Sequence, residues 1–304
     1  MDQQRTRNIL KKVRQIEIRT RQLVTDSLAG SYHSVFKGSG MNFDEVRPYV
    51  DGDEIRTIDW NVTARTGTAH VKKFVEEREL TIMLMIDVSA STDFGSAALS
   101  KRELMAELGS VLAFSAVRNN DKVGLILFSD FIELYIAPGK GRTHILRVIR
   151  EILYYRPRGR KTDPLCALDF ISRVQKRKTV AFLISDYCLA GDFTEELAAL
   201  KKKLLICNRR HDLISVIVTD PREEALPDCG RLLIEDAETG AQVLLNSADG
   251  SVRQRYNDLS TERRARLQRT LGSAGIDTLD LSTDRSYIGS LLSFFGARKR
   301  RLAR

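Results

Sequence analysis

The chain has 304 residues, of which 42% are hydrophobic and 29% are charged. This composition is typical of a globular protein with a sizeable core, and it excludes a fibrous or largely disordered chain. No run of about eighteen apolar residues occurs, which argues against a membrane-spanning helix. The first residues also lack the apolar core of a secretion signal. We therefore expect a cytoplasmic protein.

The net charge of +9 is concentrated at the two ends of the chain. Residues 1–28 hold seven Lys or Arg against three Asp or Glu, and residues 298–304 hold five basic residues and no acid. These ends account for the whole excess, so the chain between them is neutral. Basic ends can contact nucleic acid or a membrane surface. Solvated tails are the plainer interpretation.

The first eighty residues fall into two segments. Apolar side chains at helical spacing, with Lys and Arg between them, predict a basic amphipathic helix over residues 1–28. Residues 29–78 form a segment that is dense in charge and ends in a strand-like stretch over 70–75. Its tryptophan, Trp60, is expected to anchor a core. Its acids Asp51, Asp53 and Asp59 favour an ion-pair network with nearby arginines over a metal site.

From residue 79 onward, buried apolar runs alternate with helical patterns. Strands are expected over residues 81–87, 123–128, 134–136, 179–184, 213–218 and 276–281, and a hairpin over 230–246. Helices are expected over 101–118, 143–155, 164–174, 194–204, 253–272 and 286–295. The alternation predicts a three-layer, Rossmann-like α/β domain over 79–296, with a mostly parallel central sheet and helices on both faces. Residues 297–304 are left as a basic tail.

Oxygen-bearing side chains follow two of the predicted strands and precede one helix. Asp87, Ser89 and Ser91 come at the end of the first apolar run, Asp186 follows another, and Thr162 precedes the helix that begins at 164. Parallel strands bring such positions to one edge of a sheet, where ligands usually bind. Oxygen-only donors suit a hard cation such as Mg²⁺. The alternative is that these side chains merely cap turns and helices.

At these residues the sequence resembles the von Willebrand factor A fold with its metal-ion-dependent adhesion site. It is closer still to the bacterial family called domain of unknown function 58, whose hallmark resembles residues 49–60, with later blocks at 220–223 and 236–240. The resemblance implies that the serines and the threonine contact the ion and that the acids act directly or through water. The implied ligands are Asp87, Ser89, Ser91, Thr162 and Asp186. One departure is that Arg160 and Lys161 stand where glycines are usual, which puts two cations near the proposed ion.

The resulting hypothesis is a non-enzymatic protein-binding module. Mg²⁺, or Mn²⁺ or Ca²⁺, would accept an acidic side chain from a protein partner. The resemblance implies a MoxR-type AAA+ ATPase as that partner, in chaperone-like or complex-assembly work. One alternative is a metal-dependent hydrolase or phosphotransferase that uses Asp87, which would want a second acid, a base or a phosphate cradle. Another is nucleic-acid binding through the basic ends, for which the sequence contains no recognised module.

Overall fold

The computed structural model describes residues 42–75, 79–189 and 193–302. The amphipathic helix predicted over residues 1–28 lies outside these residues. The described residues divide into two compact units, one within residues 36–80 and one within residues 81–302. The smaller unit overlaps the charged segment predicted over residues 29–78, and the packing of that segment on the α/β core stays a prediction.

The smaller unit is a two-stranded antiparallel sheet with a short helical connection. β1 (Asn42–Pro48) pairs with β2 (His70–Val75), and η2 (Ile55–Thr57) and α3 (Trp60–Thr66) lie between them in sequence. The guanidinium of Arg47 binds both carboxylate oxygens of Asp53 at 2.7 Å. Asp59 caps α3 by accepting from the backbone N–H groups of residues 61 and 62. Part of the predicted ion-pair network therefore forms, and Asp59 caps the helix.

Trp60 does not anchor a core, and that expectation was wrong. It is the first residue of α3, and 67% of its surface is exposed. No residue of α3 is buried. The helix therefore lies at the surface of its unit, and the indole ring of Trp60 faces solvent.

The larger unit is built on a six-stranded sheet in the order β10-β7-β6-β3-β4-β5. Its strands are β3 (Thr81–Asp87), β4 (Lys122–Phe128), β5 (Ile132–Gly139), β6 (Val180–Ser185), β7 (Asp212–Thr219) and β10 (Asp277–Ser282). All neighbours pair in parallel except β5, which runs antiparallel to β4 at the edge. The prediction of a mostly parallel central sheet is confirmed.

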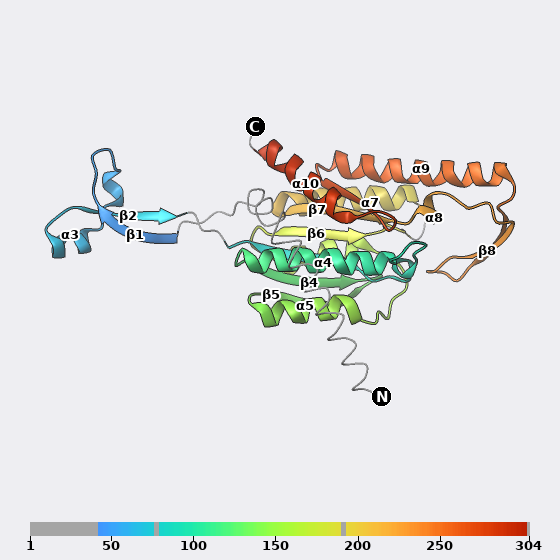
Figure 1. Ribbon diagram of the computed structural model, residues 1–304, viewed down its shortest axis with the longest axis horizontal. Coiled ribbons are helices and arrows are strands. Elements are labelled where there is room, and N and C mark those ends of the chain that lie inside the picture. Colours follow the sequence, from blue (N-terminus) through green and yellow to red (C-terminus); the bar gives the residue numbers. More distant parts are fainter. Residues whose placement is uncertain (1–41, 76–78, 190–192, 303–304) are drawn as a thin grey trace, which may run out of the picture. The chain divides into compact units, whose positions relative to one another are not determined.

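Helices cover both faces of this sheet, as predicted (Figure 1). α6 (Pro164–Val174), α7 (Phe193–Arg210) and α9 (Gly250–Ser273) share one core with the side chains of Met83 and Met85. α4 (Lys101–Arg118) and α5 (Arg142–Tyr154) meet on the opposite face, where Gly109 lies against Ile86 and Ile152. Among the helices that the structure describes, none combines the length and apolar character needed to cross a membrane.

The last helix runs further than predicted. α10 (Tyr287–Leu302) continues through residues that were expected to form part of a solvated tail over 297–304. Arg298 is buried, and its guanidinium binds Asp212 and, at 2.7 Å, Asp277. Arg301 binds Asp277 as well, also at 2.7 Å. Acids at the starts of β7 and β10 therefore draw the basic segment onto the domain.

Three short elements connect the layers near the carboxyl ends of the strands. These are η3 (Ala90–Asp93), α8 (Pro221–Glu224) and a hairpin of β8 (Arg231–Glu235) with β9 (Gln242–Asn246). The hairpin lies beyond the strand ends of the central sheet (Figure 1). Together with the loop before α6, these elements surround the sheet edge at which Asp87 and Asp186 lie.

Candidate functional site

The site lies where the direction of winding of the sheet reverses. β3 and β6 are neighbours, and from them the sheet grows outward through β4 on one side and β7 on the other. Loops leaving two such strands turn away from each other and open a crevice at the carboxyl edge, the usual place for a ligand in this type of sheet. β3 ends at Asp87 and β6 ends at Ser185, so both strands bring oxygen-bearing side chains to that edge of the sheet.

Three hydroxyl groups meet in this crevice. We call Ser89, Ser91 and Thr162 the hydroxyl cluster. The Oγ atoms of Ser89 and Ser91 are 3.1 Å apart, and Thr162 Oγ1 lies 2.8 Å from Ser89 Oγ. All three side chains are buried. Their loops are joined through the backbone, because the N–H of Ala90 donates to the carbonyl of Arg160 at 3.0 Å.

Asp87 is the last residue of β3, next to the hydroxyl cluster in sequence, and is fully buried. One carboxylate oxygen accepts from the backbone N–H of Ser89 at 2.9 Å, and the other accepts from Ser185 Oγ at 2.6 Å. Burial raises the pKa of Asp87 above its ordinary value, and the nearby charge of Asp186 adds to that rise. The structure thus gathers four of the five predicted ligands into one hydrogen-bonded network.

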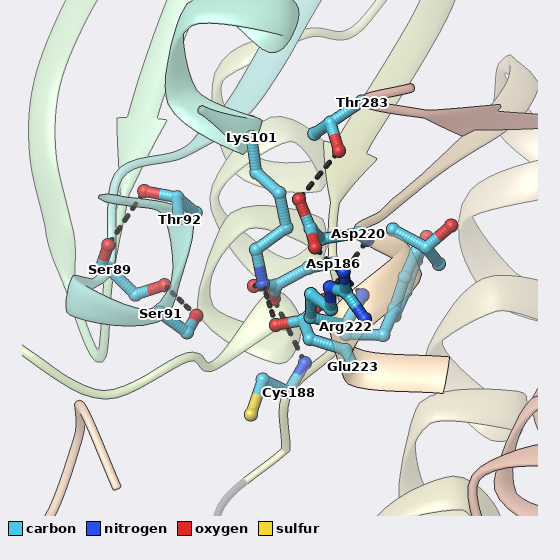
Figure 2. Close-up of polar contacts among 12 residues, drawn as sticks. Ser89, Ser91, Thr92, Lys101, Asp186, Cys188, Asp220, Arg222, Glu223 and Thr283 are labelled. Atoms are coloured by element: carbon cyan, nitrogen blue, oxygen red, sulfur yellow. Dashed lines mark hydrogen bonds and ion pairs between the residues drawn. The ribbon is translucent and has the colours of Figure 1, made fainter. Parts of the chain in front are cut away.

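The fifth, Asp186, has a different partner. Its carboxylate accepts from Lys101 Nζ at 2.7 Å and from the backbone N–H of Cys188 at 3.0 Å. Lys101 Nζ also binds Glu223 at 2.5 Å (Figure 2). We call Lys101, Asp186 and Glu223 the lysine cluster.

Lys101 is wholly buried, which alone would lower its pKa. The carboxylates of Asp186 and Glu223 outweigh that effect and hold the pKa above its ordinary value, so Lys101 stays charged.

A further carboxylate reaches the hydroxyl cluster from a distant part of the chain. Glu238 lies in the turn of the β8–β9 hairpin, and its Oε1 is 2.6 Å from Thr162 Oγ1. Only 7% of Glu238 is exposed. Burial raises the pKa of its carboxyl, and the charges of Asp186 and Asp236 raise it further against the hydrogen bond from Thr162.

Sequence reasoning missed four of these side chains as site residues, namely Lys101, Ser185, Glu223 and Glu238. Lys101 begins a helix that was predicted, yet nothing in the pattern indicates that its side chain is buried. Ser185 sits next to the predicted Asp186, so its position at a strand end was an available signal. Glu238 comes from a hairpin turn whose folding back onto the site cannot be read from spacing.

The two basic residues that precede Thr162 do not enter the hydroxyl cluster. Arg160 and Lys161 are both exposed. The guanidinium of Arg160 instead donates to the carbonyl of Ala237 at 2.9 Å, in the hairpin turn. The two cations that we expected near the proposed ion therefore lie on the outside of the site.

The donor chemistry fits a hard divalent cation. Asp87, Glu238 and the hydroxyl cluster offer only oxygen atoms, the donors that Mg²⁺ and Ca²⁺ prefer. In the part of the chain that the structure describes, no group of three or more His, Cys, Asp or Glu could hold a metal. A cation here would therefore depend on the hydroxyl oxygens for much of its coordination.

Proton counting supports that fit. Thr162 Oγ1 lies within hydrogen-bond distance of both Ser89 Oγ and Glu238 Oε1, but a threonine hydroxyl carries one hydrogen. The buried carboxylates of Asp87 and Glu238 are not contacted by any basic side chain among the hydrogen bonds and ion pairs of the described residues. Buried negative charge of this kind is costly unless it is paired or binds a metal.

Comparison with known proteins places the chain in a family. A profile of the family described as "Protein of unknown function DUF58" matches residues 45–266. The uncharacterized protein Rv1480 of Mycobacterium tuberculosis is 30% identical over 290 residues, which are 95% of this chain and 89% of that protein.

Two solved structures are similar at low sequence identity. An aerotolerance-related membrane protein from Bacteroides fragilis has a TM-score of 0.46 and 16% identity over 73% of this chain and 99% of that one. The SpRpn10 VWA domain has a TM-score of 0.39 and 12% identity over 70% of this chain and 94% of that one. From the match to the family profile and the similarity to Rv1480, we conclude that this chain is a member of the DUF58 family of proteins of unknown function.

Proposed function

We propose that this chain is a protein-interaction module whose site takes a divalent cation, Mg²⁺ in the first place. Asp87, Ser89, Ser91 and Thr162 would hold the ion, with Asp186 close by. The ion would supply an electrophilic centre for an acidic side chain of a protein partner. Neutral hydroxyls suit this work, because they leave more of the ion's charge for an incoming carboxylate than a set of acids would.

The observation that carries this proposal is the hydroxyl cluster itself. Ser89 and Thr162 are far apart in sequence, yet their oxygens lie 2.8 Å apart, and both side chains are buried. A structural role for two such hydroxyls would need only one hydrogen bond each. Their convergence with Ser91 on the same side of a buried carboxylate favours a common ligand.

The alternatives draw less support from the same contacts. An enzyme that used Asp87 as a nucleophile or base would want a second acid, a base or a phosphate cradle beside it, whereas the hydrogen bonds that Asp87 accepts among the described residues come from Ser89 N–H and Ser185 Oγ. For nucleic-acid binding through the basic ends, Arg298 and Arg301 would have to leave the ion pairs that they make with Asp212 and Asp277.

Binding of Mn²⁺, a paramagnetic substitute for Mg²⁺, tests the site directly. We expect saturable binding of one ion by the full chain, followed by electron paramagnetic resonance. Ser89→Ala should weaken that binding by roughly tenfold or more, since even outer partners of metal ligands have effects of that size. The matched control is Ser110→Ala, which removes an equally buried hydroxyl that bonds only Ala106 O. Unchanged Mn²⁺ binding in Ser89→Ala would refute the proposed site.

The partner requires a separate test. The family resemblance implies a MoxR-type AAA+ ATPase, and we propose such an ATPase as the protein that presents the acidic side chain. A purified MoxR-type ATPase from the same organism should bind the wild-type chain in Mg²⁺ and release it when EDTA is added. Ser89→Ala should bind it weakly under both conditions. Strong binding of both chains that persists when EDTA is present would show that the ATPase docks elsewhere.

A further inference from the structure

The β8–β9 hairpin is held to the domain by a charged side chain rather than by an apolar one. Every residue from 231 to 246 is described, and among them only Glu238 is buried. The apolar side chains of Leu233, Val243 and Leu244 are 64%, 54% and 64% exposed. A two-stranded hairpin has little stability of its own in water. Its position therefore depends strongly on what its turn contacts.

The turn is shaped to direct Glu238 inward. Asp236 accepts the backbone N–H of Glu238 at 2.9 Å and the hydroxyl of Thr239 at 2.7 Å. Gly240, at φ 72°, closes the turn by donating its N–H to the carbonyl of Asp236 at 2.7 Å. Positive φ is easy for glycine and rare for other residues. The turn is thus organised before it meets the site, and it presents the carboxylate of Glu238 to Thr162.

Few interactions within the protein compensate for the burial of the Glu238 carboxylate. Its hydrogen-bond donors both belong to Thr162: the hydroxyl Oγ1, whose single hydrogen is also within reach of Ser89 Oγ, and the backbone N–H. The guanidinium of Arg160, on the same loop, donates to the carbonyl of Ala237 and not to Glu238. A carboxylate buried without a cation is unfavourable, whereas the same carboxylate beside a divalent ion would be a good ligand.

We propose that Glu238 is an internal ligand of the site, and that its carboxylate holds the position that a partner's acidic side chain would take. The β8–β9 hairpin is then a built-in competitor, which a partner must displace before it can bind. This inference rests on the proposed function, because it requires a divalent cation at the hydroxyl cluster.

Competition of this kind lowers the apparent affinity for the partner. Because the internal and external carboxylates exclude each other, the apparent affinity equals the affinity of the open form multiplied by the fraction of molecules in which the hairpin is open. By the same linkage, a bound partner favours the open hairpin to the same extent. The hairpin therefore regulates the site without a separate effector site.

Water relaxation around bound Mn²⁺ tests the proposal in the full chain. Each coordination position that the protein leaves open is filled by exchanging water, which raises the relaxation rate of the solvent protons. Removal of the internal ligand in Glu238→Ala should raise this rate per bound ion and weaken Mn²⁺ binding by about tenfold. Acetate, used as a free carboxylate, should then lower the rate in Glu238→Ala and leave the wild type unchanged.

The matched control is Glu235→Ala. Glu235 is an exposed residue of the same hairpin whose carboxylate accepts from Gln242 Nε2 at 2.9 Å, away from the site. It should bind Mn²⁺ like the wild type and ignore acetate. Circular dichroism should show the same fold in both variants, since neither substitution touches the core.

The outcomes separate the two proposals. If wild type and Glu238→Ala bind Mn²⁺ with equal affinity and equal relaxation, while Ser89→Ala loses the ion, the internal ligand is refuted and the metal site stands. If none of the chains binds Mn²⁺, both proposals are overturned. Higher relaxation and acetate sensitivity confined to Glu238→Ala would support the internal ligand.

Discussion

The lysine cluster and the hydroxyl site, meaning Asp87 and Glu238 with the hydroxyl cluster, lie at the same edge of the sheet. Each contains two carboxyl groups. In the lysine cluster, Lys101 Nζ lies 2.7 Å from Asp186 and 2.5 Å from Glu223. In the hydroxyl site, the carboxylates of Asp87 and Glu238 receive only hydroxyl and backbone N–H donors.

The difference shows at which of the two places the protein's own side chains neutralise the buried carboxylates. A buried ion pair with Lys101 is complete, and a second cation would have to compete with a tethered one. Hydroxyl donors soften the cost of a buried carboxylate but do not cancel its charge. The lysine cluster therefore has its cation within the chain, whereas a cation at the hydroxyl site, as we propose, would have to come from solution.

The largest effect should come from removing the tethered cation. Lys101→Met keeps most of the side-chain volume but leaves Asp186 buried without its partner. Breaking one side of a buried ion pair commonly costs about 3–5 kcal/mol, because the remaining charge is uncompensated. We expect a loss of that size in the free energy of unfolding measured by urea denaturation.

Lys203→Met provides the control for Lys101→Met. Lys203 Nζ lies 2.6 Å from Asp169, but both side chains are more than a third exposed. A pair of this kind contributes at most about 1 kcal/mol. Equal losses in the two variants would mean that the lysine cluster is no more than a surface ion pair, and the contrast with the hydroxyl site would disappear.

The next largest effect concerns Asp220, another buried carboxylate at the same edge. It caps α8, and its carboxylate accepts from the N–H and hydroxyl of Ser96, from Thr283 Oγ1 and from the N–H of Arg222. Burial alone would raise its pKa, but these hydrogen bonds outweigh it and hold the pKa below its ordinary value. This carboxylate is completed by donors alone, with neither a lysine nor an ion.

A lowered pKa means that Asp220 stabilises the fold above pH about 3.9, the value in the unfolded chain, and that this contribution is lost as the pH falls through the folded-state pKa. Asp220→Asn should lower the free energy of unfolding by about 1.5–3 kcal/mol at pH 7. The difference in the free energy of unfolding between wild type and Asp220→Asn should become smaller as the pH is lowered towards 3. Asp249→Asn, at the exposed cap of α9, should show a much smaller gap. A gap for Asp220→Asn that is constant with pH would contradict this assignment.

Much of the larger unit was predictable because its elements have strong periods. The pattern over residues 101–118 gave α4 to the residue, and the apolar run ending at Asp87 gave β3. Once parallel strands are expected, the topology predicts that the loop after β3, with Ser89, and the end of β6, with Ser185, lie at the same edge of the sheet. The antiparallel course of β5 did not follow, because a short apolar run carries no signal of direction.

The parts that escaped prediction depend on contacts between distant residues. Lys101 has the spacing of any first-turn residue, and only the folded chain shows that two acids enclose it. Glu238 is one acid in a charged turn until the hairpin folds over Thr162. Arg298 was read as part of a tail, since its partners Asp212 and Asp277 belong to strands far from it in sequence. Charge pairing of this kind leaves no period in the sequence.

The smallest expected effect comes from Gly159→Ala, a change in the loop before Thr162 that should affect the hydroxyl site but not the lysine cluster. A Cβ at Gly159 would lie 2.2 Å from the Oγ of buried Ser129 and 2.1 Å from Asp130 Oδ1, so either these side chains or the loop that carries Thr162 must move, and we expect the loop to take part because Ser129 Cβ would also lie only 2.9 Å away. Gly159→Ala should cost about 1–3 kcal/mol, the usual penalty of overpacking. It should weaken Mn²⁺ binding as well, because Thr162 moves relative to Ser89. The lysine cluster comes from other loops and should keep its ion pairs.

Gly272→Ala gives the matched control for that shift. Gly272 lies in α9 with no atom within 4 Å of an added Cβ, so the substitution should stabilise the helix by about 0.5–1 kcal/mol and leave Mn²⁺ binding as it is. If Gly159→Ala lost stability but bound Mn²⁺ with wild-type affinity, the position of Thr162 would not matter to the ion. The hydroxyl side chains would then only cap turns and helices. The hydroxyl site and the lysine cluster would both have a structural role.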